Sequence, residues 1–335
     1  MAFRTQSGET DLFDCAFADA PTNVTLHEIE AIIDWHRLRD VLAPAYDRSG
    51  VGRPGHDPVL LAKLQILMRL YNLSDERVCH EAADRLSFRR FLGLTAADLV
   101  PDSSTLTRFR ERLRAAGLEG AVSAFFDGEL ERHQLRAQEG EMKIVDATII
   151  PAATRPPKKD QPAGKRDTEA RHAVKHGKTH FGFKVHAAVE AKTKLVRAVH
   201  AAPANVHDSR AFTQVLDGKE SLVLAGKAHH NGELFDWLRE KGVGNAIMLQ
   251  GRRGAPLPEE IDAWWKKRIS PLRCRVEHAF AHLKRWRGMG RAVYVGTARV
   301  RTQVTWAVVA YNLRQAVTLL NRGINQGGDG APAAA

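Results

Sequence analysis

The feature that most constrains this chain is a change of sequence pattern near residue 141. Before it, apolar residues recur at helical spacing, as in the run VLLAKLQILMRLY that follows Asp57 and Pro58. After it come short apolar runs of strand length, such as MKIVDATII and SLVLA. We therefore expect a helical domain over residues 1–140, a mixed domain over 141–322 and a disordered, Gly/Ala-rich tail over 323–335.

Helix-start signals divide the first domain further. Ser74 and Asp102 stand at N-cap positions, ahead of DERVCHEAADRL and TLTRFRERLRAAG, and Gly117 ends the second of these helices. Between the two helices, SFRRFLGL predicts a short amphipathic turn. A helix, a short turn and an Arg-rich helix resemble a helix-turn-helix, in which Arg108 and Arg110 could reach DNA phosphates or base edges. The alternative is a solvated helix face.

The order of elements after residue 141 predicts the fold class. A strand at MKIVDATII is followed by a hairpin turning at 192–194, a short helix at DSRAFTQVL and the strand SLVLA. A helix at GELFDWLREKG, the strand NAIML and two further helices, RCRVEHAFAHLKRW and TARVRTQVTWAVVAYNLRQAVTLL, complete the domain. This order is that of a ribonuclease H-like fold, a mixed sheet with helices on both faces, so the whole chain is of the α+β class.

A long basic segment separates the first strand from the hairpin. Residues 151–179 are rich in proline, glycine and cations and predict a loop. Its cationic side chains are suited to the phosphate backbone of DNA, and the alternative is a surface insertion without a ligand. The candidate contacts in this segment are Lys158, Lys159, Lys165, Arg166 and Lys178.

Charge favours a polyanionic partner. The chain has 50 Lys and Arg against 39 Asp and Glu, a net charge of +11, which points to nucleic acid first and an anionic membrane second. No apolar run approaches the ~20 residues of a membrane span, and the N-terminus lacks a signal-peptide core. The three cysteines have no paired spacing and are expected to be reduced thiols. These features predict a cytoplasmic protein without a membrane partner.

Two acidic residues stand out as candidates for chemistry. Asp146 interrupts an otherwise apolar strand, where a carboxylate needs a metal or a cation as partner. Glu277 shares a helix stripe with Arg273 and Lys284 at the rim of an apolar face. From the residues alone, a paired structural aspartate and a simple ion pair between Arg273 and Glu277 remain open alternatives.

Taken in order, these motifs resemble bacterial insertion-sequence transposases of the DDE type, in the group around insertion sequence five. WHRLRD, the segment from GRPGHDP to RRFLGL and PDSSTLTRFRERL resemble that group's helical DNA-binding region. VDATII resembles its first catalytic strand, DTEARHAVKHGKTHFGFKVH its loop and hairpin, and ANVHDS the end of its third strand. Arg273, Glu277 and Lys284 match its Arg-x3-Glu-x6-Lys signature, and the similarity extends to about residue 320.

The resemblance implies roles for these residues. Asp146 and Glu277 would be the first and third acids of a triad that holds two Mg²⁺ ions, for which Mn²⁺ can substitute. The ions would activate a water or a DNA 3′-hydroxyl for displacement at phosphorus. Lys284 would bind a phosphate near the scissile bond, and Arg273 would orient Glu277 or a phosphate. The implied partners are double-stranded DNA, at transposon ends and target sites, and further copies of the chain.

The sequence departs from this family at its second acid. Where the family has Asp, Lys, a small residue and Tyr, this chain has Gly226, Lys227, Ala228 and His229, and Ser270 replaces the tyrosine three residues before Arg273. The loss of the second aspartate implies impaired cleavage, or alternatively a catalytically inactive, sequence-specific DNA-binding regulator derived from a transposase. Compensation by a neighbouring ligand remains open, and the candidates are Asp208, His229 and His230.

Overall fold

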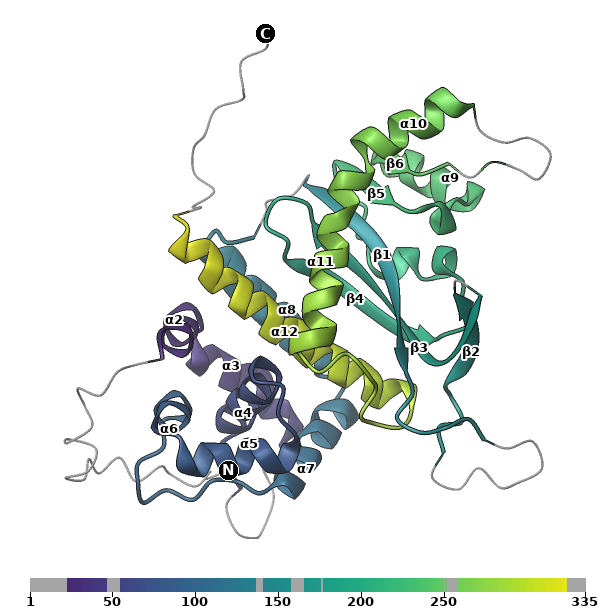
Figure 1. The fold of residues 1–335 in the computed structure, drawn as a ribbon. Helices are drawn as coiled ribbons and strands as arrows, with labels where there is room; N and C mark the ends of the chain where they lie inside the picture. Colours follow the sequence, from purple (N-terminus) through teal and green to yellow (C-terminus); the bar gives the residue numbers. More distant parts are fainter. Residues whose placement is uncertain are drawn as a thin grey trace.

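The computed structural model describes residues 23–46, 55–136, 141–157, 166–175, 177–249, 251 and 258–323. The N-terminal part is helical, as expected (Figure 1). Its helices are α2 (Val24–Ile32), α3 (Trp35–Leu42), α4 (Pro58–Leu70), α5 (Asp75–Asp84), α6 (Leu86–Leu92), α7 (Ser103–Ala115) and α8 (Glu119–Arg132), with a short 3-10 turn, η1 (Ala43–Ala45), after α3.

Helix α4 is the centre of this part. Asp57 caps it by accepting a hydrogen bond from the Val59 amide at 2.9 Å, and Pro58 occupies its first position, where no amide donor is needed. Every residue of α4 is buried, which confirms the expectation of a core helix. The surrounding helices therefore pack on all sides of α4 and form one apolar core with it.

The N-caps at Ser74 and Asp102 are confirmed, but the connection between α5 and α7 differs from the expectation. SFRRFLGL forms helix α6, not a turn, because Phe88, Phe91 and Leu92 are buried on one side of it. Gly93, with φ of 70°, ends α6 in the left-handed conformation that glycine adopts at little cost. Helices α5 and α7 are thus separated by a further helix and a loop, so a minimal helix-turn-helix is a wrong description of this region.

The second part contains the mixed sheet expected from the sequence, with strand order β2-β3-β1-β5-β6 and β4 paired with β3. β3 pairs antiparallel with β1, β2 and β4, whereas β1, β5 and β6 run parallel to one another, which is the arrangement of a ribonuclease H-like fold. The strands are β1 (Met142–Pro151), β2 (Arg171–Lys175), β3 (Lys178–Glu190), β4 (Val196–Pro203), β5 (Leu222–Ala225) and β6 (Gly244–Ile247).

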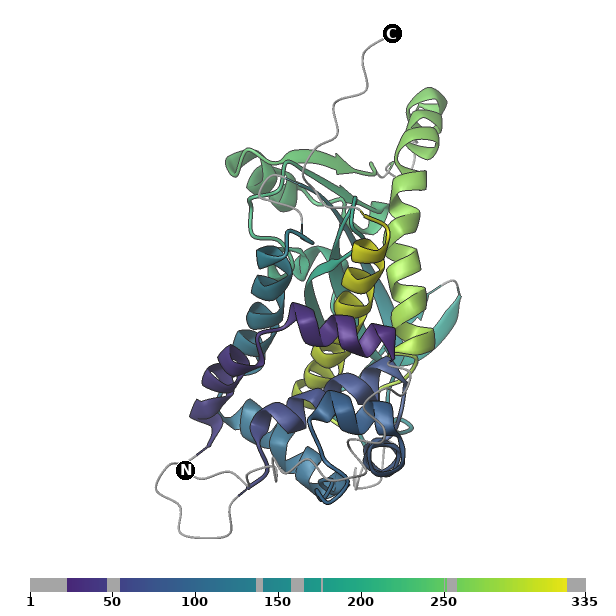
Figure 2. The ribbon, with the colours of Figure 1, turned by 90° about the vertical axis from the view of Figure 1, so that its left-hand side faces the viewer.

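Three local differences separate this part from the sequence expectation. Residues 171–175, assigned to the loop, form β2 and pair with the start of β3. The segment DSRAFTQVL forms two 3-10 turns, η2 (Asp208–Arg210) and η3 (Phe212–Gln214), in place of a short α-helix. Helix α10 (Glu259–Arg268), which the sequence analysis did not identify, precedes α11 (Ser270–Trp286) and extends beyond the sheet (Figure 2).

Helices cover both faces of the sheet. Side chains of α11 and α12 (Thr297–Asn321) pack on the face that carries Ile144 and Ile150, and α9 (Gly232–Glu240) packs on the opposite face with Val145. Helix α12 also contributes Trp306 and Leu313 to the core of the N-terminal helices, so it lies between the two parts (Figure 1). Within the described ranges, no helix is both long and apolar enough to cross a membrane.

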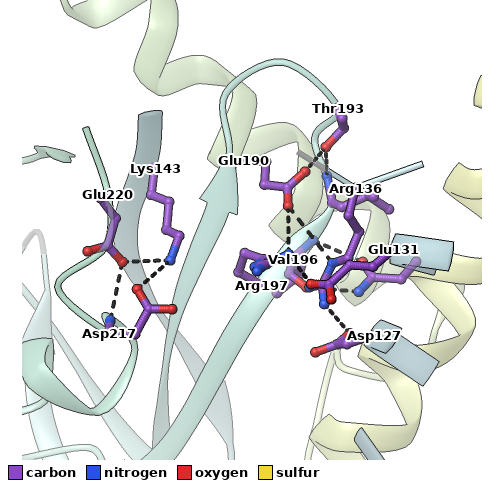
Figure 3. A network of polar contacts seen from close by, with 12 residues as sticks. Asp127, Glu131, Arg136, Lys143, Glu190, Thr193, Val196, Arg197, Asp217 and Glu220 are labelled. Atoms are coloured by element: carbon purple, nitrogen blue, oxygen red, sulfur yellow. Dashed lines mark hydrogen bonds and ion pairs between the residues drawn. The ribbon is translucent and has the colours of Figure 1, made fainter. Parts of the chain in front are cut away.

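Ion pairs with buried members lie at the end of the sheet where β1 begins and β3 ends (Figure 3). Lys143 on β1 contacts Glu220 at 2.6 Å and Asp217 at 3.2 Å. Glu190 on β3 contacts Arg197 at 3.4 Å and Arg136, just after α8, at 3.9 Å. The Arg136–Glu190 contact joins the end of the helical part to the sheet, and removal of either partner would leave a buried charge uncompensated.

Candidate active site

Asp146 lies in the middle of β1, on the face covered by α11. Side chains alternate along a strand, so Asp146 shares this face with Ile144 and Ile150, both of which are in the core beneath α11. Its carboxylate is half-buried, and Oδ1 accepts a hydrogen bond from the Ala147 amide at 2.8 Å. The remaining oxygen, Oδ2, faces the helix.

Gly226 is the neighbour of Asp146 on the next strand. β1 and β5 run parallel with Val145 opposite Ala225, so the next pair in this register is Asp146 and Gly226. Gly226 has φ of −76° and ψ of 170°, an extended conformation that any residue can adopt. The backbone therefore does not require glycine here, and an aspartate at this position would point toward the same face as Asp146.

Arg273 on α11 fills the space beside Gly226. Its guanidinium lies 3.6 Å from Oδ2 of Asp146, and a Cβ atom built on Gly226 would lie 3.0 Å from Nη2. Nη1 is 3.4 Å from the sulfur of Met248, a weak acceptor, and Nε is buried without a partner in the described ranges of the chain. Of the two alternatives left open by the sequence, a paired aspartate is correct, because Asp146 has a cationic partner. The ion pair between Arg273 and Glu277 is not formed, because Arg273 pairs with Asp146.

Glu277 and Lys284 follow Arg273 along the stretch of α11 that packs on β1. Lys284 Nζ donates a hydrogen bond to the Ile149 carbonyl at 2.9 Å, so α11 contacts β1 at Asp146 and again three residues later. Glu277 lies between these contacts, one helical turn after Arg273, and its side chain is exposed. A common position for Asp146 and Glu277 at the same sheet edge stays a prediction that this arrangement supports.

Burial changes the ionisation of Lys284. It lowers the pKa of the Lys284 ammonium, and the nearby charge of Lys175 on β2 lowers it further. Lys175 and Lys178 are exposed on the two strands of the β2–β3 hairpin. Lys284 therefore lies near Lys175, and an anion placed between them would be stabilised by both.

The three candidate substitutes for the missing aspartate, Asp208, His230 and His229, have different environments. Asp208 is 2.8 Å from Lys184, which projects from β3 on the face opposite Asp146. Burial alone would raise the pKa of Asp208, but the hydrogen bond and charge of Lys184 hold it below its ordinary value. His230 is exposed and packs against the ring of Phe235.

His229 is fully buried, within reach of the charges of Asp208 and Asp146. Burial lowers its pKa, while the charges of Asp208 and Asp146 act in the opposite direction. Burial also lowers the pKa of His186, on the Asp208 side of the sheet, to about 4. Both ring nitrogens of each histidine lack a hydrogen-bond partner in the described part of the chain. These two neutral histidines were not identified as a buried pair, because nothing in the sequence separates them from surface histidines.

The residues present do not fit the expected pair of Mg²⁺ ions. Such a site needs several carboxylate oxygens around ions about 3.5–4 Å apart. Gly226 supplies no ligand, and the guanidinium of Arg273 lies beside Asp146. A divalent cation ~4 Å from that guanidinium would be repelled by about 8 kcal/mol at an effective dielectric constant of about 20. Among the residues that the structure describes, no three His, Cys, Asp or Glu side chains form a metal-binding group.

The cations expected to contact DNA have different environments. Arg108 is 62% exposed and Lys178 is exposed, whereas Arg166 is half-buried and donates to the Pro156 carbonyl at 3.0 Å. The expectation for Arg110 is corrected, because its side chain is only 4% exposed and makes two hydrogen bonds to Asp75, at 2.9 and 2.5 Å. Lys158, Lys159 and Lys165 lie outside the described residues.

Comparison with known proteins places these features in a family context. A family model described as "Transposase DDE domain" matches residues 138–313, which is more than half of the chain, and one described as "Transposase domain (DUF772)" matches residues 15–112. Among solved structures, the chain is similar to a pre-cleavage Mos1 transpososome, with 11% sequence identity, 82% of each chain covered and a TM-score of 0.21. At that score the likeness is too slight to support any conclusion about this chain.

Proposed function

The chain belongs to the DDE transposase family, and on that premise we propose that it binds the terminal inverted repeats of an insertion sequence as double-stranded DNA. DDE transposases cleave and join DNA strands and normally use divalent metal ions. Of the acids that the family uses for such ions, this chain keeps Asp146 and Glu277 and lacks the one at position 226. Membership of the group around insertion sequence five, and action as a homo-oligomer on DNA, are further parts of this proposal.

We further propose that strand cleavage by this chain is impaired. The observation that carries this proposal is the register of β1 and β5, which puts Gly226 beside Asp146, where a second carboxylate is required. Loss of a metal ligand removes several kcal/mol of transition-state stabilisation, and each 1.36 kcal/mol corresponds to a factor of ten in rate. A chain with this centre would cleave DNA several orders of magnitude more slowly than a transposase with a complete triad.

The proposed DNA surface consists of exposed and half-buried cations on two parts of the chain. Lys175 and Lys178 face each other on the β2–β3 hairpin, the charge of Lys175 reaches Lys284, and Lys284 contacts β1, so the phosphate backbone would pass from this hairpin toward Asp146. Arg108 is exposed on α7 in the helical part. Lysine and arginine side chains on one surface bind phosphates without regard to sequence, and they release condensed counterions when they do so.

A regulator that binds DNA without cutting it is the second candidate function, and Gly226 is the observation that favours it. Such a protein would use the helical part for sequence recognition and would keep the sheet as a fixed support. It would bind the same terminal repeats and compete there with an intact transposase.

Binding and nicking of the inverted-repeat ends of the element that carries this chain test the proposal. We expect the affinity for the repeat duplex to exceed that for a scrambled duplex, and to fall at least tenfold from low to physiological salt. Slow nicking above the level of an Asp146→Asn variant would favour a weak transposase, and binding without any nicking would favour the regulator. An affinity that does not change with salt would contradict DNA binding in both forms.

A further inference from the structure

The unusual contact at this centre joins three residues, Asp146, Gly226 and Arg273. The guanidinium of Arg273 occupies the volume next to the Gly226 Cα where an aspartate side chain would begin. Its closest charged neighbour is Asp146, at 3.6 Å. The missing carboxylate has therefore not left an open space, because a cationic side chain fills it.

We infer that Arg273 serves as the fixed cation of this centre, and that a DNA phosphate binds there without a divalent metal ion. This inference rests on the proposed DNA binding and adds to it the ligand chemistry of the centre. Arg273 balances the charge of Asp146, which in a complete triad would be balanced by metal. It also presents its remaining donors to an anion that approaches along β1.

The donors of Arg273 are incompletely used. A guanidinium has five N–H groups in a planar fork that suits two oxygens of one phosphate. Among the residues that the structure describes, Nη2 faces Asp146, Nη1 faces only the sulfur of Met248, and Nε is buried with no partner. The Arg273 side chain is 20% exposed, so a phosphate oxygen could reach it with a small shift and would be a better acceptor than a thioether.

Glycine at 226 is consistent with this role. A Cβ at this position would lie 3.0 Å from Nη2 and 3.2 Å from Cζ, so any side chain would push the guanidinium away from its present place. An aspartate would also accept hydrogen bonds from Arg273 and use the donors that a phosphate needs. The glycine and the position of Arg273 therefore belong together.

Two measurements on the purified full-length chain test this inference. Mn²⁺ binding is followed by electron paramagnetic resonance, with Asp146→Asn as the reference for binding elsewhere. DNA affinity is measured by fluorescence anisotropy at equal ionic strength, with EDTA or with millimolar Mg²⁺. The matched control is Arg285→Gln, because Arg285 is an exposed cation on the same helix that does not contact Asp146.

We expect the unmodified chain to bind no more Mn²⁺ than Asp146→Asn does at millimolar concentrations. Its DNA affinity should differ less than about twofold between EDTA and Mg²⁺. Arg273→Gln should lower the affinity in EDTA by about tenfold, the loss expected for a charge-assisted phosphate contact, and Arg285→Gln by clearly less. Arg273→Lys, which keeps the charge but not the fork, should recover only part of that loss.

Two results would overturn the inference. One is binding of Mn²⁺ by the unmodified chain that depends on Asp146, because a metal would then displace Arg273. The other is equal DNA affinity of Arg273→Gln and Arg285→Gln in EDTA. The first measurement requires no Arg273 variant, so it decides the matter even if Arg273→Gln does not fold. Either result leaves the proposed DNA binding intact, whereas a chain that binds no DNA at all would contradict the proposed function itself.

Discussion

Replacement of Gly226 by aspartate is the most informative change at this centre. Gly226 lies beside Asp146 in the β1–β5 register, and its extended backbone accepts any L-residue. The change adds one carboxylate to the face of the sheet that already carries Asp146. With Glu277 of α11 in its proposed place at the same edge, the centre would then have the three acids that its family uses for two divalent ions.

The structure indicates the size of each effect. The new Cβ would lie 3.0 Å from Nη2 of Arg273, so the flexible end of this side chain must move by a few tenths of an ångström. Because the three atoms nearest to the Cβ all belong to the flexible side chain of Arg273, the free energy of unfolding should change by less than about 1 kcal/mol. Once Arg273 has moved, metal-dependent nicking should rise by about a hundredfold or more, or about 2.7 kcal/mol of transition-state stabilisation.

The assay is single-turnover nicking of repeat-end duplex with Mg²⁺, for the unmodified chain, Gly226→Asp and Gly226→Asn. Asparagine has nearly the same shape without the charge, so Gly226→Asn should remain at the unmodified level. The reasoning is refuted if the unmodified chain already nicks as fast as Gly226→Asp. A residue other than one at position 226 would then supply the second acid, and not Asp208 in its present place, since its partner Lys184 projects from the opposite face of the sheet.

Three further predictions concern the helices and the DNA surface. Arg110→Ala should lower the free energy of unfolding, measured in urea, by about 3 kcal/mol, because it leaves the half-buried Asp75 unpaired. Arg108→Ala should change it by less than about 0.5 kcal/mol. Equal losses for the two variants would contradict the assignment of Arg110 to the core. Hydrogen bonds from Ser104 and Thr105 lower the pKa of the Asp102 cap to about 2 from 3.8, so its stabilisation is present above pH 3.8 and is lost as the pH falls toward 2. The difference in thermal midpoint between the unmodified chain and Asp102→Ala should therefore shrink over that interval, and a constant difference would argue against a charged cap. Lys178→Ala should weaken DNA binding for all sequences and reduce the salt slope by about one, and an unchanged slope would remove Lys178 from the DNA surface.

Features with local causes were predictable from the sequence. The caps at Asp57, Ser74 and Asp102 depend on side chains adjacent to the helix start, and all three are present in the structure. The order of strands after residue 141 also holds, because each buried strand has its own apolar run. Helix α6 was mistaken for a turn because its two turns are shorter than the window in which helical periodicity is recognisable.

Features that depend on tertiary contacts were not predictable. Arg108 and Arg110 are two residues apart on one Arg-rich helix, yet only Arg110 points into the core, because Asp75 on α5 lies opposite it. The partner of Arg273 could not be chosen from the sequence either, since Glu277 one turn away was the nearest acid along the chain. Contact between α11 and β1, more than a hundred residues earlier, decides in favour of Asp146.

The central claim is that this DDE transposase chain binds DNA through a centre that Arg273, rather than metal, neutralises. The most direct measurement is single-turnover nicking of repeat-end DNA by the unmodified chain with Mg²⁺, compared with Asp146→Asn at saturating protein. We predict binding of the duplex by both proteins and nicking rates that differ by less than about tenfold, because the incomplete centre contributes little. Rapid nicking that requires Mg²⁺ and disappears in Asp146→Asn would contradict the account.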